Sequence, residues 1–271
     1  MLTVRRVQPD PRLRKFVRAY VERRTCAASP VPPVEPFVAR LGVMIDFLFA
    51  SLYDLPVRGS NVFSSCFRVA VVGPHSHGRV ELVAGGRIDE VAVLFEPQGF
   101  YQLFGEPTSL FVDGGTEARG VLGAPIQRLY ERLGDTEEFH KRALILDEFL
   151  LHKLPRVPSR DQLSEAFDSL IASAGPLTVK ETARQAGLSV RQLERKSLDY
   201  TGLGPKRVCR IARFERALRI KWSTGASWTA IAHDLDYHDQ MHLIHDFLAL
   251  AGDTPGRILR RVHADYRIGV S

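Results

Sequence analysis

The region that begins at Pro176 constrains the fold most, because helix caps and helix-stopping residues recur there at short intervals. Thr178 is followed three residues later by Glu181, which is the spacing of a capping box. Gly187 would end the helix that this box begins, and Ser189 is placed to cap the next helix. Caps and stops continue in this way to the end of the region, where no segment reads as a strand. The pattern predicts six helices and an all-α domain.

A short helix, a turn and a longer helix occur twice in this region, which is the plan of a helix-turn-helix motif. In such a motif the second helix presents its N-terminal turns to base edges in the major groove of DNA. The motif needs a small residue where its helices cross and a turn residue that tolerates a positive φ angle. The first copy supplies Ala183 and Gly187, and the second supplies Ala232 and Asp236. A long helix over residues 205–222 is predicted to join the two copies.

The excess positive charge of the chain lies entirely in this region. Residues 176–271 hold 16 Lys and Arg against 10 Asp and Glu, a difference equal to the net charge of +6 of the whole chain. Residues 180–221 hold 12 basic and 4 acidic side chains. Basic side chains that neutralise phosphates release condensed counterions, so such a block favours a polyanion as partner. A solvated helix face carries similar charge, and the charge alone leaves both interpretations open.

Polar side chains early in each second helix are the candidates for DNA contact, because arginine pairs bidentately with guanine and glutamine with adenine. With two basic residues at the start of the long helix, the candidates are Ser189, Arg191, Gln192, Glu194, Arg195, Lys206, Arg207, Gln240, Met241, His242 and His245. Double-stranded promoter DNA is the partner that we predict for these helices.

At these residues the chain resembles the AraC/XylS family of bacterial transcription regulators. Two spaced stretches within residues 176–262 are similar to the family, TVKETARQAGLSVRQLERKSLDYTGLGPKRVCRIARFERAL and WTAIAHDLDYHDQMHLIHDFLALAGDTP. The resemblance implies a double helix-turn-helix, homeodomain-like fold that reads two adjacent major-groove segments. It also implies a sequence-specific regulator of transcription, an activator or a repressor, with RNA polymerase as a further partner.

Several positions depart from the family pattern. Ser197 stands where the family usually has a buried phenylalanine, which predicts a shallow gap or a local repacking. Asp236 stands where glycine is usual, but aspartate tolerates the left-handed conformation better than most residues. His245 stands where arginine is common, and residues 222–256 contain five aspartates and no lysine or arginine. We therefore expect the first motif to supply most of the affinity, and the second to add little or to add pH-dependent contact through its histidines.

The first 151 residues predict an α+β domain. Glycine and proline separate short runs rich in β-branched and aromatic residues, as strand ends require. These runs are residues 37–50, 67–72, 79–84 and 88–95. The proline-rich segment 25–36 is expected to be an extended connector, and the spacing of FYQLFG is typical of a helix.

Apolar residues at helical spacing predict two helices, over 123–134 and 136–151, that close this domain. Residues 152–175 are predicted to form a linker and a connecting helix, and residues 176–264 the DNA-binding domain. The tract EVAVLFEPQGFYQLFGEP resembles the N-terminal domain of a subgroup of AraC-like regulators, with Gln98 in place of a glycine of the subgroup's signature. The resemblance implies sensing or dimerisation, so a small-molecule effector and a homodimer are expected partners. Amphipathic helices also commonly serve their own core.

A metal site is the main alternative for this domain. His75 and His77, followed by Glu81, match the HxHxxxE spacing of metal-binding cupins. Gln102 replaces the histidine that such a site needs further along, so a polar turn between two strands is the favoured interpretation. The alternative that stays open is a metal-binding cupin-like protein, or an enzyme, fused to a helix-turn-helix domain.

Other sequence features argue against membrane, secreted and catalytic classes. No stretch approaches the ~18 uninterrupted apolar residues that span a bilayer, and the charged N-terminus lacks the apolar segment of a secretory signal. The three cysteines are scattered, which suits a reducing compartment. No GxSxG elbow and no phosphate-binding glycine loop is present. We expect a cytoplasmic protein that binds rather than catalyses, with no cofactor.

Overall fold

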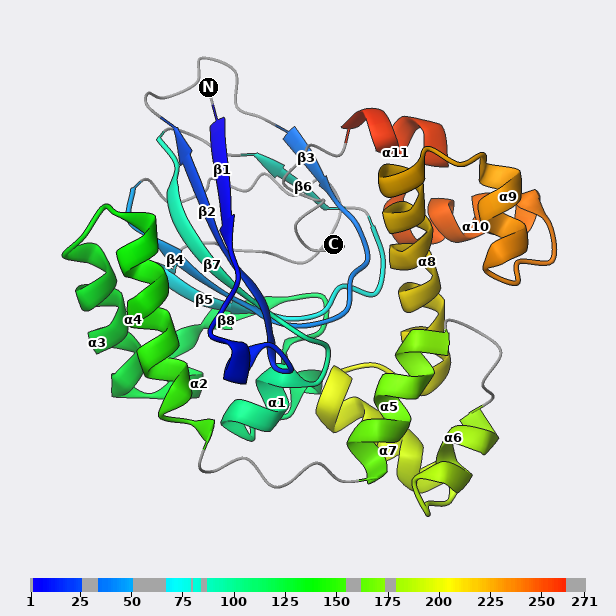
Figure 1. Cartoon of the computed structure of the whole chain (residues 1–271), viewed down its shortest axis with the longest axis horizontal. Coiled ribbons are helices and arrows are strands. Elements are labelled where there is room, and N and C mark those ends of the chain that lie inside the picture. The colour runs from blue at the N-terminus through cyan, green and yellow to red at the C-terminus, as the bar shows by residue number, and fades with distance from the viewer. Residues whose placement is uncertain are drawn as a thin grey trace.

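The chain folds into an N-terminal part built on a β-sheet and a C-terminal part built of helices (Figure 1). The structure is a computed structural model that describes residues 2–25, 34–50, 67–78, 80–83, 87–154, 162–173 and 179–261. The fold confirms the predicted order of an α+β domain followed by an all-α domain. The predicted helix cap at Thr178 lies outside the described residues.

The N-terminal sheet has six antiparallel strands in the order β1-β2-β7-β4-β5-β8. The strands are β1 Leu2–Val7, β2 Val17–Thr25, β4 Met44–Leu48, β5 Val69–Val72, β7 Asp89–Phe95 and β8 Gly115–Glu117. A separate ribbon pairs β3 Val34–Phe37 with β6 Val80–Val83. The runs predicted at 67–72, 79–84 and 88–95 are confirmed as β5, β6 and β7. The run 37–50 is divided between β3, an irregular segment and β4, and the sequence analysis did not predict β1 and β2.

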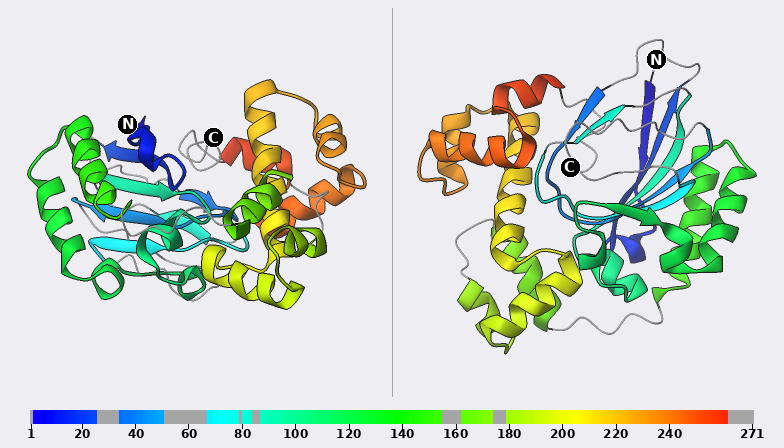
Figure 2. Two further views of the ribbon diagram at one scale, coloured as in Figure 1. Left: turned by 60° about the horizontal axis from the view of Figure 1, so that its bottom comes forward. Right: turned by 180° about the vertical axis from the view of Figure 1, so that it is seen from behind.

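One face of the sheet is covered by helices and holds the main hydrophobic core. These helices are α2 Ala118–Leu122, α3 Ala124–Gly134 and α4 Phe139–Leu151. Figure 2 shows from two sides that α3 and α4 lie on the far side of the sheet from the C-terminal helices. Leu129 of α3 and Leu146 of α4 are buried in one cluster with Ile45 and Val93 of the sheet. The apolar faces of the two predicted helices are therefore used within the domain.

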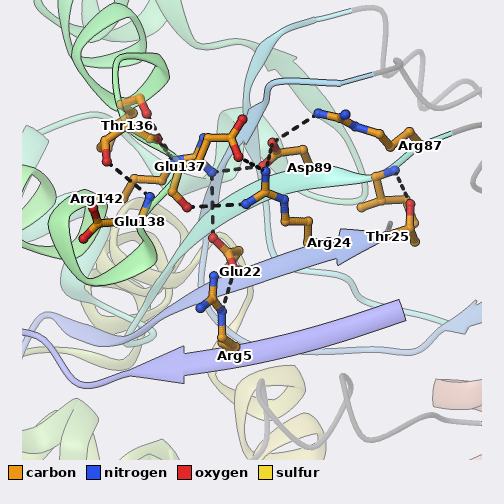
Figure 3. A network of polar contacts seen from close by, with 12 residues as sticks. Arg5, Glu22, Arg24, Thr25, Arg87, Asp89, Thr136, Glu137, Glu138 and Arg142 are labelled. Atoms are coloured by element: carbon orange, nitrogen blue, oxygen red, sulfur yellow. Dashed lines mark hydrogen bonds and ion pairs between the residues drawn. The ribbon is translucent and has the colours of Figure 1, made fainter. Parts of the chain in front are cut away.

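A buried arginine ties α4 to this face of the sheet (Figure 3). The Arg142 side chain is 2% exposed, and its Nη1 atom lies 3.0 Å from Asp89 Oδ1 and 3.8 Å from Glu22 Oε1. Its Nε atom donates to the carbonyl oxygens of Leu133 and Thr136 at 3.1 and 2.7 Å. A buried guanidinium is tolerated here because its charge and donors meet carboxylates and carbonyls.

The opposite face of the sheet carries buried charged groups, and we call it the polar sheet face. Side chains alternate along a strand, so Asp46 points to this face while its neighbour Ile45 lies in the core. Burial and the Glu90 carboxylate raise the pKa of Asp46 well above its usual range, whereas the guanidinium groups of Arg40 and Arg23 lower it. The Arg23 Nη1 atom lies 3.5 Å from Glu90 Oε2. The polar sheet face is therefore a closely balanced set of opposite charges.

The C-terminal part consists of helices joined by short turns. They are α5 Gln162–Ser173, α6 Val179–Gln185, α7 Val190–Thr201, α8 Pro205–Thr224, α9 Trp228–Asp234, α10 Gln240–Ala251 and α11 Pro255–Arg261. Six of them lie in the described residues after 178, which confirms the predicted number. Between the sheet and these helices lie α1 Gly99–Phe104, as the FYQLFG spacing indicated, and the 3-10 helix η2 Thr108–Phe111. Within the described ranges, no helix is long and apolar enough to span a bilayer.

Candidate DNA-binding surface

The first motif consists of α6, a turn and α7, and it shares a core with α5. Ala183 of α6 and Leu193 of α7 are buried against Phe167 of α5. Gly187 in the turn has a φ of +64°, and the Leu188 N–H donates to the Ala183 carbonyl at 2.9 Å. A positive φ favours glycine, so the residue that the motif needs at this turn stands where it was predicted.

Ser189 begins α7 through the capping box. Its Oγ atom accepts from the Gln192 N–H at 3.3 Å, while Gln192 Oε1 accepts from the Ser189 N–H at 2.9 Å. The two bonds satisfy N–H groups that lack partners inside the helix. Two of the predicted contact residues therefore have a structural role as well, because they fix the first turn of α7, in which Arg191 lies.

Arg191, Glu194 and Arg195 form one exposed stripe along α7, which we call the α7 stripe. Residues three and four apart lie on one face of a helix, and Ser197 on another face is buried. Leu198 is 43% exposed and extends the α7 stripe by one turn. Leu198 was not among the predicted contact residues, and an apolar side chain at this position could contact the methyl group of a thymine.

Hydroxyl groups occupy the place where the family resemblance implies a buried phenylalanine. Ser197 and Thr201 both have no exposed surface. Ser197 Oγ donates to the Leu203 carbonyl at 2.5 Å, and Thr201 Oγ1 lies 3.1 Å from the same oxygen. The predicted local repacking is therefore polar, and it closes the turn between α7 and α8.

The second motif consists of α9, a turn and α10, and it is built like the first. Ser227 Oγ accepts from the Ala230 N–H at 3.2 Å and so caps α9. Asp239 Oδ1 accepts from the His242 N–H at 2.7 Å and so caps α10, which holds the pKa of this carboxyl below its usual value. Asp236 in the turn has a φ of +53°, so the aspartate does adopt the left-handed conformation.

All four predicted contact residues of the second motif are exposed on α10, namely Gln240, Met241, His242 and His245. Met241 is 55% exposed, and Gln240 Oε1 accepts from Thr229 Oγ1 at 3.0 Å. Residues 222–256 contain no lysine or arginine, and the nearest basic groups come from α8, where Arg210 pairs with Asp246 at 2.7 Å. The geometry of the two motifs is shared, but the charge is not.

Lys206 and Arg207 are exposed in the first turn of α8. The Arg207 Nη2 atom donates to the carbonyl oxygen of Ser76 at 3.2 Å. Because Ser76 belongs to the turn between β5 and β6, this guanidinium lies at the boundary between the two parts of the chain. The sequence analysis grouped both residues as DNA contacts, whereas the structure brings Arg207 to the N-terminal domain.

The first motif is held against the N-terminal domain by α1 and η2. Thr108 Oγ1 donates to the carbonyl oxygen of Tyr200 at 3.1 Å, and the Tyr101 and Tyr200 rings lie 4.4 Å apart. Gln98, which replaces a glycine of the family subgroup, is buried, and its Nε2 atom donates to Asp168 Oδ1 of α5 at 2.8 Å. These contacts involve the C-terminal end of α7, so the α7 stripe stays exposed.

His75 and His77 lie in the turn between β5 and β6, as the favoured interpretation predicted. His75 is 1% exposed, and its Nδ1–H donates to the Gly73 carbonyl at 3.1 Å. Burial lowers the pKa of His75 well below its usual value, so the ring is neutral. The side chain of Glu81 lies outside the described residues. In the part of the chain that the structure describes, no three His, Cys, Asp or Glu residues are arranged to hold a metal ion.

Residues 182–261 match a family model described as a helix-turn-helix domain. A curated relative is the HTH-type transcriptional regulator GlxA of Rhizobium meliloti (strain 1021), which is 26% identical over 216 residues. That match covers 70% of this chain, and the chain spans 65% of the length of the relative.

Solved structures that are similar to this chain include those of AdpA and ToxT. The DNA-binding domain of AdpA, described as a global transcriptional factor in complex with a target DNA, is 24% identical, covers 40% of this chain and 95% of its own, and has a TM-score of 0.34. ToxT from Vibrio cholerae is 10% identical, covers 97% of this chain and 99% of its own, and has a TM-score of 0.49.

Proposed function

We propose that this chain, whose C-terminal part is a helix-turn-helix domain of the AraC type, regulates transcription by binding double-stranded promoter DNA. The observation that carries the proposal is the α7 stripe, which presents two arginines and a glutamate on a helix whose first turn is fixed by a capping box. The proposed contact residues are Ser189, Arg191, Gln192, Glu194, Arg195, Lys206, Arg207, Gln240, Met241, His242 and His245. We also propose the domain boundaries: an α+β domain over residues 1–151, a linker with a connecting helix over 152–175, and the DNA-binding domain over 176–264.

The long helix α8 suits the spacing of two major-groove contacts. It contains 20 residues, and a helix of that length spans ~30 Å. One turn of DNA repeats after ~34 Å, so motifs at the two ends of α8 can reach successive major-groove segments on one side of the duplex. A buried apolar face of α8, with Ile211, Phe214 and Leu218, packs against the second motif and keeps this spacing fixed.

The N-terminal domain is proposed to control DNA binding by orienting the motifs rather than by covering them. The α7 stripe is exposed while α1 and η2 hold the other end of α7, so docking of this domain leaves the stripe accessible. Further proposed partners are a small-molecule effector, RNA polymerase and a second copy of the chain. The proposed mechanism is binding, with no catalytic step.

Selection of bound fragments from a random DNA pool tests the proposal. We expect enrichment of a site that covers one or two major-groove segments. A salt series on that site should give a log–log slope of about −0.9 for each phosphate contacted. A chain that enriches no sequence and shows no salt-dependent affinity would instead act through proteins alone.

A further inference from the structure

A short segment of the N-terminal domain lies inside the hydrophobic core of the DNA-binding domain. The segment is Val38–Leu41, between β3 and β4, and we call it the strap. Three of its four side chains are buried in one cluster with Phe214 of α8 and Phe247 of α10. The two parts of the chain therefore share a core at this place, and the strap cannot move without disturbing the packing of the second motif.

Backbone hydrogen bonds join the strap to α8 and α10. The Ala39 N–H donates to the carbonyl oxygen of Leu250 at 2.6 Å, near the C-terminal end of α10. The last carbonyls of a helix lack partners inside it, so the strap supplies a donor that this helix end needs. The Leu41 N–H donates to Oε1 of Glu215 at 2.7 Å, and Glu215 is 4% exposed in the middle of α8.

The remaining strap residue, Arg40, belongs to the polar sheet face. Its backbone N–H and carbonyl pair with those of His75 at 2.9 and 3.0 Å. Its Nη1 atom lies 3.1 Å from Met44 Sδ, and its charge stabilises the ionised form of Asp46. Arg40 therefore contacts the N-terminal domain, while its neighbours Ala39 and Leu41 are bonded to helices of the DNA-binding domain.

Close backbone contacts leave the strap little freedom of its own. Gly42 follows the strap with a φ of +87°, and a Cβ atom there would lie 2.6 Å from the Phe95 carbonyl oxygen. A Cβ atom on Gly78 would overlap the backbone of Leu250 and Ala251. Packing this tight transmits a displacement rather than absorbing it.

We propose that the strap couples the polar sheet face to the second helix-turn-helix motif. A displacement of Arg40 at the polar sheet face would be carried to α10 and α8 by the hydrogen bonds that Ala39 and Leu41 make. The first motif is held elsewhere, by α1 and η2, so the effect is selective for the second motif. The inference depends on the proposed function only where it identifies α10 as a DNA-facing helix.

Hydrogen–deuterium exchange of the full chain without DNA tests the coupling. We expect Arg40→Met to make exchange about tenfold faster in the strap and over residues 243–251, because local opening becomes easier. Residues 179–201 of the first motif should exchange as in the unchanged chain. Arg132→Met is the matched control, since Arg132 is half exposed on α3 and pairs with Glu148. Equal acceleration in both motifs would show general destabilisation and overturn the proposal.

A second pair of variants keeps the test valid if Arg40→Met fails to fold. Asp46→Asn keeps the shape of the side chain and prevents its ionisation, and Asp135→Asn makes the same change on an exposed residue at the end of α3. We expect exchange over residues 243–251 to change in Asp46→Asn and to stay as in the unchanged chain in Asp135→Asn. Unchanged exchange in Asp46→Asn, or the same change in both variants, would overturn the coupling. Failure of the unchanged chain to bind DNA would overturn the proposed function and leave these exchange results standing.

Discussion

The two helix-turn-helix motifs share a scaffold and differ in the surface that they present. Both turns contain a residue with a positive φ, Gly187 at +64° and Asp236 at +53°, and both second helices begin with a side-chain cap. The first motif then exposes arginines, whereas the second exposes Met241 and histidines amid aspartates. Caps, turns and core packing are therefore sufficient to keep the fold, and the charge that attracts DNA can vary independently of them.

The motifs also differ in how they are joined to the N-terminal domain. The first motif and α5 meet α1 and η2 through single side chains such as Tyr200 and Gln98. The second motif shares a hydrophobic core with the strap. The more basic motif therefore meets the N-terminal domain at the C-terminal end of α7, whereas the less basic motif shares buried apolar packing with it.

The largest expected effect is the difference in DNA affinity between a variant of α7, Arg195→Ala, and a variant of α10, Gln240→Ala. Arg195→Ala should weaken binding to the selected site about 10- to 100-fold, because a good bidentate base contact contributes ~1–3 kcal/mol. Gln240→Ala, in the first turn of α10, should weaken it less than about threefold, because α10 itself carries no lysine or arginine. Fluorescence anisotropy at one salt concentration compares the two variants. Equal losses, unchanged between pH 6 and pH 8, would refute the asymmetry between the motifs.

Adding positive charge to the second motif should reduce the asymmetry. His245→Arg places a permanent charge on the exposed face of α10, where we expect affinity to rise several-fold and the salt slope to steepen by about 0.9 for one new phosphate contact. His233→Arg is the control, because its side chain is 91% exposed on α9, outside the recognition helix. The same gain in both variants would point to a general charge effect rather than a contact made by α10.

Local patterns predicted the C-terminal domain well because its signals are local. Ser189 and Gln192 lie three residues apart, and the cap they form depends on little beyond that spacing. The predicted apolar face of α8, for example Ile211 and Phe214, is buried as expected. The α7 stripe and the exposed residues of α10 also lie where the family resemblance implied.

The N-terminal domain and the strap were predicted less completely, because long-range contacts determine them. Charged residues interrupt the apolar alternation of β1 and β2, and ion pairs with distant residues accommodate them, as where Arg5 pairs with Glu22 across the two strands. The strap lies within a run that looked like part of one strand. Its burial depends on Glu215, which is 174 residues from Leu41 in the sequence. No local pattern contains that contact.

The smallest expected effect concerns the bond between the strap and α8, and it tests how the second motif is attached. Burial raises the pKa of Glu215, against the opposing effects of Arg18, of the hydrogen bond from the Leu41 N–H and of Arg219, so the ionised carboxyl destabilises the folded chain at high pH. Glu215→Gln keeps an oxygen that accepts from the Leu41 N–H and removes the charge.

We therefore expect Glu215→Gln to raise the free energy of unfolding at pH 8, where the carboxyl of the unchanged chain would be ionised and buried. A raised pKa means that the folded chain gains stability as the carboxyl takes up its proton, so the advantage of the variant should shrink as the pH falls through the folded pKa and vanish below the unfolded value. Urea unfolding at pH 8 and pH 5 measures the difference. Glu215→Leu, which leaves the Leu41 N–H buried without this acceptor, should be less stable at both pH values. A destabilised Glu215→Gln at pH 8 would mean that the two arginines outweigh burial, and that the strap is joined to α8 by charge rather than by the hydrogen bond alone.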